Sequence, residues 1–113
     1  MKPLRRDKIE EVIHRLAAEF VRNEAGKSSL LTITRVELLP AGKDAIVYFT
    51  TLPESQEETA LKFLDRKTGE FKHFVLERTR LGSVPFIRFK IDFGERNRQR
   101  LDELSQEEEK RQV

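Results

Sequence analysis

Apolar residues in the first part of the chain recur with the spacing of an amphipathic helix. Most of the residues between them are charged, which predicts one buried face and one solvated face over residues 9–21. A stripe this regular indicates a helix that faces the protein core. The stripe follows the i, i+3, i+4, i+7 pattern and consists of Ile9, Val12, Ile13, Leu16, Ala17, Phe20 and Val21.

The next two segments have the composition and alternation of β-strands. Residues 30–39 are rich in β-forming side chains, but their apolar positions change parity part-way along. That change indicates either a bulge near Thr34 and Arg35 or partial burial of both faces. Residues 40–44 have turn composition, and residues 45–51 alternate again. Together these segments predict an antiparallel hairpin.

Residues 55–80 carry two short helical patterns that meet at Gly69. Ser55 and Glu58 have the spacing of a capping box at the start of the first helix. A glycine inside a helix costs roughly 1 kcal/mol relative to alanine, so a kink or break at Gly69 fits better than one continuous helix. Residues 86–92 then alternate as a third strand.

The predicted order is helix, strand, strand, helix, helix, strand, in a single α+β domain over residues 4–93. The crossover through the helical pair would cover one face of a three-stranded sheet and leave the other face more open. Beyond Phe93 the apolar pattern fades, and Leu101 with Leu104 supports one helical turn at most. We expect residues 94–113 to form a polar, mobile tail.

Composition narrows the class of protein. The chain has no cysteine, which excludes disulfides and thiolate metal sites. No apolar run approaches the ~20 residues of a membrane helix, and the basic N-terminus is followed by charged residues and not by the apolar stretch of a signal peptide. We expect a cytoplasmic monomer that has no membrane partner, metal or cofactor.

The formal net charge of +2 is unevenly distributed. Residues 62–100 hold eleven Lys or Arg and five Asp or Glu, whereas residues 101–113 hold two and five. The middle of the chain is therefore suited to a polyanion, although a basic but merely solvated surface explains the same charge. The candidate RNA-contacting residues are Arg66, Lys67, Gly69, Lys72, Arg78, Arg80, Arg88 and Lys90, with the N-terminal basic cluster of Lys2, Arg5, Arg6 and Lys8 as a second candidate.

Catalytic chemistry finds little support in the sequence. The two histidines, His14 and His73, lie at helix positions that are predicted to be exposed. There is no Cys/His ligand spacing, no phosphate loop and no Gly-x-Ser-x-Gly motif. Most of the eight phenylalanines fall at core-facing positions, but Phe86 and Phe93 lie off the pattern at the strand ends and are candidates for ligand contact. We expect no enzymatic activity.

Four short motifs follow one another along the chain: TITRVELLP at 32–40, AIVY at 45–48, TGEF at 68–71 and PFIRF at 85–89. In this order and spacing they resemble ribosome-binding factor A over nearly the whole chain. The resemblance implies a type II KH-like domain with a helix-kink-helix at Gly69. It also implies a protein that docks on the free small ribosomal subunit and assists late maturation of its rRNA, above all in the cold.

Two positions depart from that family's pattern: Ala41 replaces the acidic residue often found after the hairpin proline, and the second lies at the kink. The family has Ala-x-Gly at the kink, where KH domains that grip single strands carry Gly-x-x-Gly. Here the matching residues are Lys67, Thr68 and Gly69, so a cation replaces the alanine. An alternative interpretation is a KH-like module whose basic face binds an acidic protein. A small hydrolase, a third alternative, would need a pocket with a perturbed titratable group, and the sequence offers no candidate.

Overall fold

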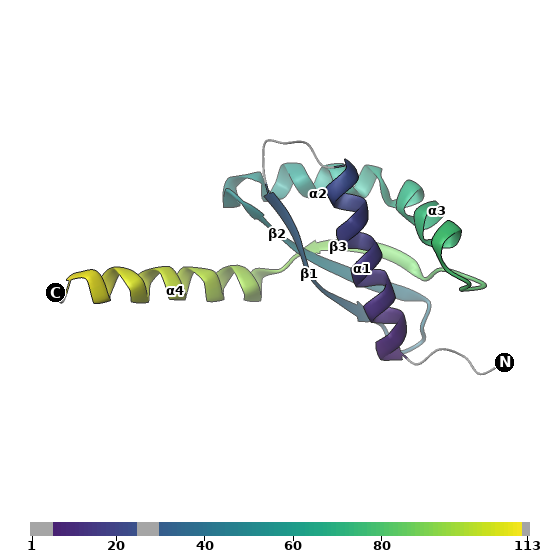
Figure 1. Ribbon diagram of the computed structural model, residues 1–113, viewed down its shortest axis with the longest axis horizontal. Coiled ribbons are helices and arrows are strands. Elements are labelled where there is room, and N and C mark those ends of the chain that lie inside the picture. Colours follow the sequence, from purple (N-terminus) through teal and green to yellow (C-terminus); the bar gives the residue numbers. More distant parts are fainter. Residues whose placement is uncertain (1–5, 25–29, 112–113) are drawn as a thin grey trace.

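The computed structural model describes residues 6–24 and 30–111. The predicted α-β-β-α-α-β order of a type II KH-like domain is confirmed, and one further helix follows it (Figure 1). The elements are α1 (Arg6–Glu24), β1 (Leu30–Leu38), β2 (Asp44–Leu52), the short 3-10 helix η1 (Glu54–Gln56), α2 (Glu57–Arg66), α3 (Thr68–Arg78), β3 (Phe86–Ile91) and α4 (Phe93–Arg111).

The three strands form one sheet in the order β1-β2-β3. β1 and β2 pair antiparallel, which confirms the predicted hairpin, and β3 runs parallel to β2. Parallel neighbours need a crossover connection, and α2 with α3 supplies it. β2 is therefore the central strand, and β3 is an edge strand.

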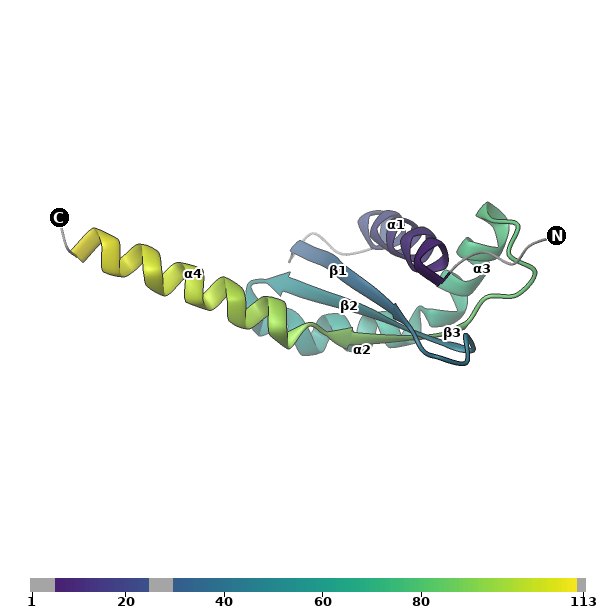
Figure 2. The ribbon, with the colours of Figure 1, turned by 90° about the horizontal axis from the view of Figure 1, so that it is seen from below.

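The core lies between the helices and one face of the sheet. Val47 of β2 pairs with Phe89 of β3, and both side chains are buried. The Phe89 ring contacts Phe71 of α3, with centroids 5.9 Å apart, and Phe71 contacts Phe20 of α1 at 5.3 Å. Figure 2 shows α1 lying along one face of the sheet. The apolar stripe predicted over residues 9–21 is confirmed as a core-facing helix.

The parity change in β1 is a β-bulge. Ile33 and Arg35 pair with consecutive residues of β2, which leaves Thr34 as the extra residue. The Thr34 hydroxyl donates a hydrogen bond of 2.6 Å to Oδ2 of Asp92, directly after β3. The bulge thus directs a polar side chain across the central strand to the residue that follows β3, and bulges commonly redirect side chains in this way.

The helix break is confirmed, but it falls at Lys67 and not at Gly69. Lys67 has φ −101° and ψ 3°, and its N–H donates to the Leu64 carbonyl at 3.0 Å, a 3-10-type bond that closes α2. Gly69 lies in the first turn of α3 without a positive φ. The backbone conformation at the break is open to any residue, so a glycine is not needed to make it. Figure 1 shows α2 and α3 pointing in different directions.

The predicted capping box at the start of α2 is wrong. Ser55 lies inside η1, and Gln56, the N-cap of α2, makes no side-chain capping bond. The acidic first turn has a tertiary role instead. Glu57 is buried, and its Oε1 lies 3.0 Å from Nη1 of Arg96 in α4.

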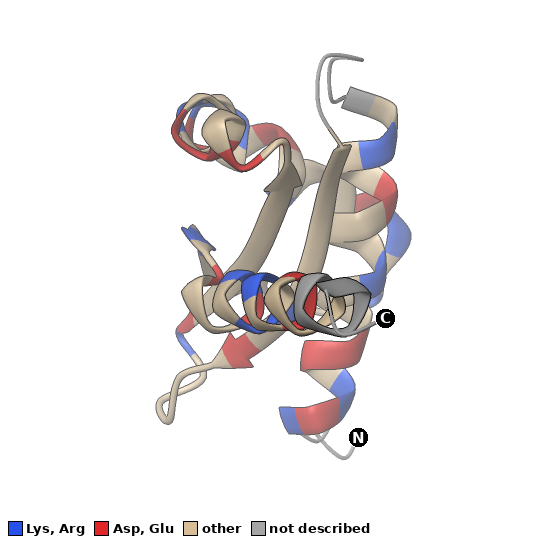
Figure 3. Ribbon diagram, turned by 90° about the vertical axis from the view of Figure 1, so that its left-hand side faces the viewer, with Lys and Arg blue, Asp and Glu red and all other residues tan. Residues whose placement is uncertain are grey.

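The C-terminal segment forms a long helix, where the sequence predicts one turn at most. Strong helix formers fill α4, and Asp92 caps its start by accepting the N–H of Glu95 at 3.0 Å. The helix projects away from the sheet (Figures 1 and 2). Acidic and basic residues are interspersed along it (Figure 3). Hydrophobic periodicity missed α4 because most of this helix has no face to bury against the domain.

We expect removal of residues 105–113 to leave the melting temperature nearly unchanged. The ion pairs that hold α4 lie before this segment and join Arg96 and Arg100 to Glu54. Circular dichroism melts of the full and truncated chains test this. A fall of several degrees would show that the segment packs on the domain. A longer deletion that also removes Arg96 is the positive control, because it leaves Glu57 buried without its partner.

Candidate nucleic-acid interface

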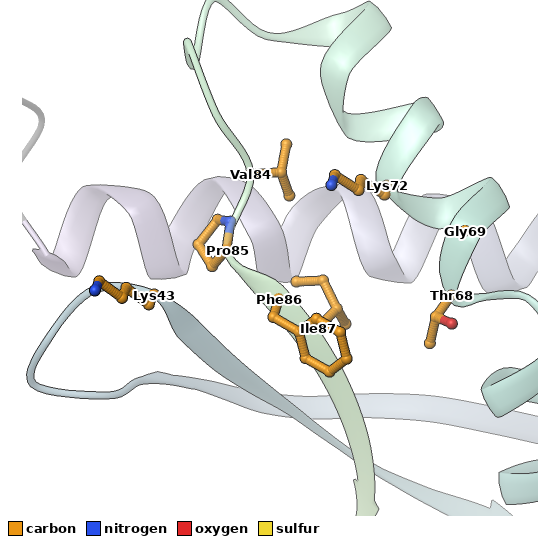
Figure 4. Close-up of a pocket in the computed structure, with 8 residues that line it drawn as sticks. All are labelled: Lys43, Thr68, Gly69, Lys72, Val84, Pro85, Phe86 and Ile87. Carbon is orange, nitrogen blue, oxygen red and sulfur yellow. The ribbon is translucent and has the colours of Figure 1, made fainter.

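A groove lies between the start of α3 and the start of β3 (Figure 4). We call it the α3–β3 groove; its volume is about 390 Å³. A second hollow of about 320 Å³ shares Lys43, Val84 and Pro85 with it and continues toward Ile9 at the start of α1. The α3–β3 groove is lined by Lys43, Thr68, Gly69, Lys72, Val84, Pro85, Phe86 and Ile87.

Lysines are the only charged residues of the described chain that line the α3–β3 groove. Lys43 comes from the turn between β1 and β2, and Lys72 comes from α3, on the other side of Val84 and Pro85 (Figure 4). Both side chains are exposed, and neither forms an ion pair within residues 6–24 and 30–111. Two uncompensated cations that line one groove make it attractive to a polyanion.

The floor of the groove is apolar. Val84, Pro85 and Ile87 contribute aliphatic surface, and Phe86 adds an aromatic ring that is 65% exposed. Phe86 is held in place by its backbone, because its N–H donates to the Lys43 carbonyl at 2.8 Å. The groove therefore combines cationic sides with an apolar floor, which suits a chain of phosphates and bases.

Gly69 leaves the groove open at the start of α3. A Cβ placed on Gly69 would meet no heavy atom within 4 Å, and the backbone has no positive φ. Nothing in the described part of the chain therefore requires a glycine here.

We expect Gly69→Ala to raise the free energy of unfolding by up to about 1 kcal/mol, because alanine is the better helix former at an unstrained position. Urea unfolding of the two proteins measures the difference. A loss of stability would show that the backbone at this position is more constrained than its geometry indicates.

Residues 5–105 match the family model described as ribosome-binding factor A. The chain belongs to the ribosome-binding factor A family. The protein of that name from Coprothermobacter proteolyticus is 31% identical over 113 residues, which cover 98% of this chain and 82% of the relative. The predicted family resemblance is confirmed.

Solved structures of this family share the fold. The crystal structure of ribosome-binding factor A from Thermus thermophilus superimposes with a TM-score of 0.68 at 26% identity, covering 78% of this chain and 97% of that one. A homology model of the Thermus thermophilus protein, fitted into a cryo-EM map of a 30S complex with ribosome-binding factor A, gives a TM-score of 0.65 at 27% identity. It covers 74% of this chain and 90% of that one.

Two of the predicted RNA-contacting residues, Gly69 and Lys72, line the α3–β3 groove of this family member. Lys67, the cation that replaces the family's alanine, lies beside the groove but folds back: its Nζ is 3.3 Å from Oε1 of Glu70 and 5.7 Å from the Phe63 ring centroid. Its charge is therefore partly compensated within the protein.

The other predicted cations are dispersed. The Arg78 guanidinium stacks on the Phe74 ring at 3.6 Å and lies 4.0 Å from a Glu19 oxygen. Arg88 and Lys90 alternate with buried residues of β3, so they lie on the open face of the sheet. Arg66 ends α2, and Arg80 follows α3 in the loop toward β3, both exposed.

One member of the N-terminal basic cluster, Arg6, has a structural role. The Arg6 guanidinium donates to the backbone carbonyls of Leu38 and Pro40, which ties the start of α1 to the hairpin. Lys8 lies 3.9 Å from a Glu11 oxygen. The other two members, Lys2 and Arg5, lie outside the described residues. RNA contact by this cluster stays a prediction.

Sequence reasoning missed Lys43. It lies in the turn of the hairpin, where lysine is common, and no pattern along the chain connects it with α3. The backbone hydrogen bond from the Phe86 N–H to the Lys43 carbonyl brings the hairpin turn to the start of β3, which forms one side of the groove. The sequence did carry a weak signal for Phe86, which it placed off the core pattern at a strand end.

The described residues offer no metal site, since no three His, Cys, Asp or Glu side chains among them gather closely enough to hold an ion. Among the same residues, no helix has the length and hydropathy needed to span a bilayer.

Proposed function

We propose that this protein docks on the free small ribosomal subunit through the α3–β3 groove and assists late maturation of small-subunit rRNA. The observation that carries the proposal is the charge of the groove. Within the described chain, Lys43 and Lys72 line it without ion-pair partners, and no carboxylate lines it. Family membership supports the choice of partner, because the Thermus thermophilus relative was fitted into a map of a 30S complex.

Phosphate contacts by the lysines would supply much of the affinity, since each contact releases counterions from the RNA. Such contacts position a protein without reading sequence, so the shape of the groove and of the rRNA would supply the specificity. In this proposal the protein acts by binding, as a cytoplasmic assembly factor without a catalytic step.

Co-sedimentation tests the docking step. The protein should pellet with free small subunits and much less with assembled ribosomes, and added salt should release it steeply. Equal binding to both particles, or to neither, would contradict the proposal. Competition then separates RNA from the alternative partner: purified rRNA should displace the protein from subunits far better than polyglutamate, whereas an acidic-protein partner predicts that polyglutamate competes well.

The maturation step needs a cellular test. In cells that lack their own ribosome-binding factor A, expression of this protein should lower the level of unprocessed small-subunit rRNA, most clearly in the cold. Primer extension at the rRNA ends measures that level. If the protein binds small subunits but the level of unprocessed rRNA does not change, the proposed docking is supported and the proposed maturation role is contradicted.

A further inference from the structure

Exposed apolar side chains gather at the end of the molecule that lies away from the α3–β3 groove. Of the seven large apolar side chains that are exposed in the described chain, three lie on α4: Phe93, Leu101 and Leu104. Two more, Leu30 and Leu52, pair with each other where the hairpin ends. The groove adjoins the start of β2, whereas these residues lie at the end of β2 or on α4. Apolar groups that gather at one end of a domain commonly mark an interaction surface.

The three apolar residues of α4 share one side of the helix. Together with Asn97 they recur at intervals of four, four and three residues, and this spacing places side chains on one helix face. Leu101 and Leu104 are 63% and 57% exposed, so the described domain leaves most of this side uncovered. Apolar residues with this spacing are the anchors by which an amphipathic helix docks in an apolar groove of a partner.

The base of α4 is fixed to the domain. Nη1 of Arg96 lies 3.0 Å from the buried Glu57 carboxylate, Nε of Arg96 lies 2.9 Å from Glu54, and Arg100 also pairs with Glu54. Beyond these ion pairs the helix projects from the sheet (Figures 1 and 2). A helix that is formed and anchored before it meets a partner loses little freedom on binding, which favours affinity.

We propose that α4 docks, through Leu101 and Leu104, on a basic protein of the small ribosomal subunit. This inference rests on the proposed function, because it names a second partner on the same subunit. The charge of the helix selects the partner. Residues 101–113 hold five acidic and two basic residues, and Asp102 and Glu103 beside the leucines are exposed. This half of α4 repels phosphates and complements a basic protein surface.

A second copy of this chain fits α4 less well. In an antiparallel pair, the acidic half of each helix would lie beside the basic first half of the other. The cations of that first half are already engaged, because Arg96 and Arg100 pair with Glu54 and Glu57, and Arg98 pairs within its own helix. A parallel pair would bring the two acidic halves together, and their like charges repel.

The first experiment compares two binding partners, free small subunits and the protein-free rRNA extracted from them. Leu101→Ala with Leu104→Ala should weaken binding to subunits roughly 10- to 100-fold, the loss typical of two truncated anchor residues, and leave binding to the rRNA unchanged. Alanine preserves the helix, and thermal melts verify that the variant is folded. Gln106→Ala is the matched control: Gln106 is exposed but lies two residues from Leu104, on nearly the opposite side of α4. It should bind both partners as the unmodified protein does.

The second experiment identifies what α4 touches. The photocrosslinker p-benzoylphenylalanine is placed at position 104 or at position 106, and each protein is irradiated in complex with free small subunits. Position 104 should give an adduct with a basic subunit protein that survives ribonuclease and is identified by mass spectrometry. Position 106 should give much less of it.

Several results would overturn the inference: an adduct from position 104 with rRNA or with a second copy of this chain, no adduct, or an alanine pair that binds subunits as the unmodified protein does. Equal losses of subunit and rRNA binding in the alanine pair would also contradict it, because α4 would then contact RNA.

The groove variant separates this inference from the proposed function. Lys43→Glu with Lys72→Glu should weaken binding to both subunits and protein-free rRNA. If it does so while the alanine pair on α4 changes nothing, the α4 inference is wrong and groove docking stands. If only the alanine pair weakens subunit binding, groove docking is wrong and α4 docking stands.

Discussion

Reversing both groove lysines, Lys43→Glu with Lys72→Glu, is expected to lower the affinity for free small subunits by roughly 100-fold or more at physiological salt. Each lysine that contacts a phosphate contributes a charge-assisted bond, and its reversal adds repulsion. The slope of log affinity against log salt should become shallower by about one unit for each phosphate that the variant no longer neutralises. Co-sedimentation over a salt series measures both quantities.

Stability should hardly change in these variants. Both lysines are exposed and make no ion pair in the described chain, so each change should stay within about 0.5 kcal/mol. Lys62→Glu is the matched control, since it makes the same charge change at an exposed position of α2 that does not line the groove. Equal losses of affinity in Lys62→Glu and Lys72→Glu would indicate a general charge effect. Unchanged affinity in the double variant would show that the groove lysines do not contact the subunit, and Arg6 and Lys8 would become the leading candidates for the contact.

Asp92→Ala should destabilise the fold more than any surface change. The carboxylate is buried and joins three segments: it accepts from the Thr34 hydroxyl at 2.6 Å and from the Glu95 N–H at 3.0 Å, and it lies 3.5 Å from Nε of Arg35. Its removal leaves the bulge hydroxyl and the start of α4 without their acceptor. We expect a loss of about 2–4 kcal/mol in the free energy of unfolding.

Urea unfolding of the Asp92→Ala variant measures this loss, and Asp65→Ala, at an exposed position of α2, is the control. A loss below about 1 kcal/mol for Asp92→Ala would mean that the bulge and α4 are held by other contacts.

The same residue predicts how stability depends on pH. Burial alone raises the pKa of Asp92, but the hydrogen bonds from Thr34 and the Glu95 N–H, together with the Arg35 guanidinium, outweigh it and hold the pKa below the ordinary value of 3.8. Since the folded pKa is lower than the unfolded one, the contribution is complete above the unfolded value and is lost as pH falls through the folded pKa.

The stability difference between the unmodified protein and Asp92→Asn should therefore be constant from neutral pH to about pH 5 and shrink below about pH 4. Urea unfolding across this range measures it. A difference that does not shrink in acid would show that the charge of Asp92 contributes nothing.

Local periodicity was sufficient for the elements that bury a face. The stripe of α1, the hairpin and the alternation of β3 follow from side chains that must reach one core, and the structure confirms each. The parity change in β1 allowed either a bulge or two partly buried faces, and only the strand register shows the bulge at Thr34. The break between α2 and α3 was predicted from the cost of a helical glycine. The structure places it two residues earlier, at Lys67, where the bridge-region backbone requires no glycine.

The hydrophobic pattern of the sequence did not predict elements that lack a buried face. α4 is stabilised by helix propensity, by the Asp92 cap and by the ion pair between Arg96 and Glu57, and none of these produces an apolar period. The ion pair joins residues from opposite sides of the helical crossover, so it has no local signature.

The sequence by itself determined the order of the elements, the core, the family and two groove residues, Gly69 and Lys72. The tertiary structure decided the groove. β3 pairs parallel to β2, which brings Phe86 to the turn that holds Lys43, while α3 carries Lys72 to the other side. That meeting depends on non-local strand pairing, and composition and periodicity along the chain do not encode distances between segments that only the fold brings together.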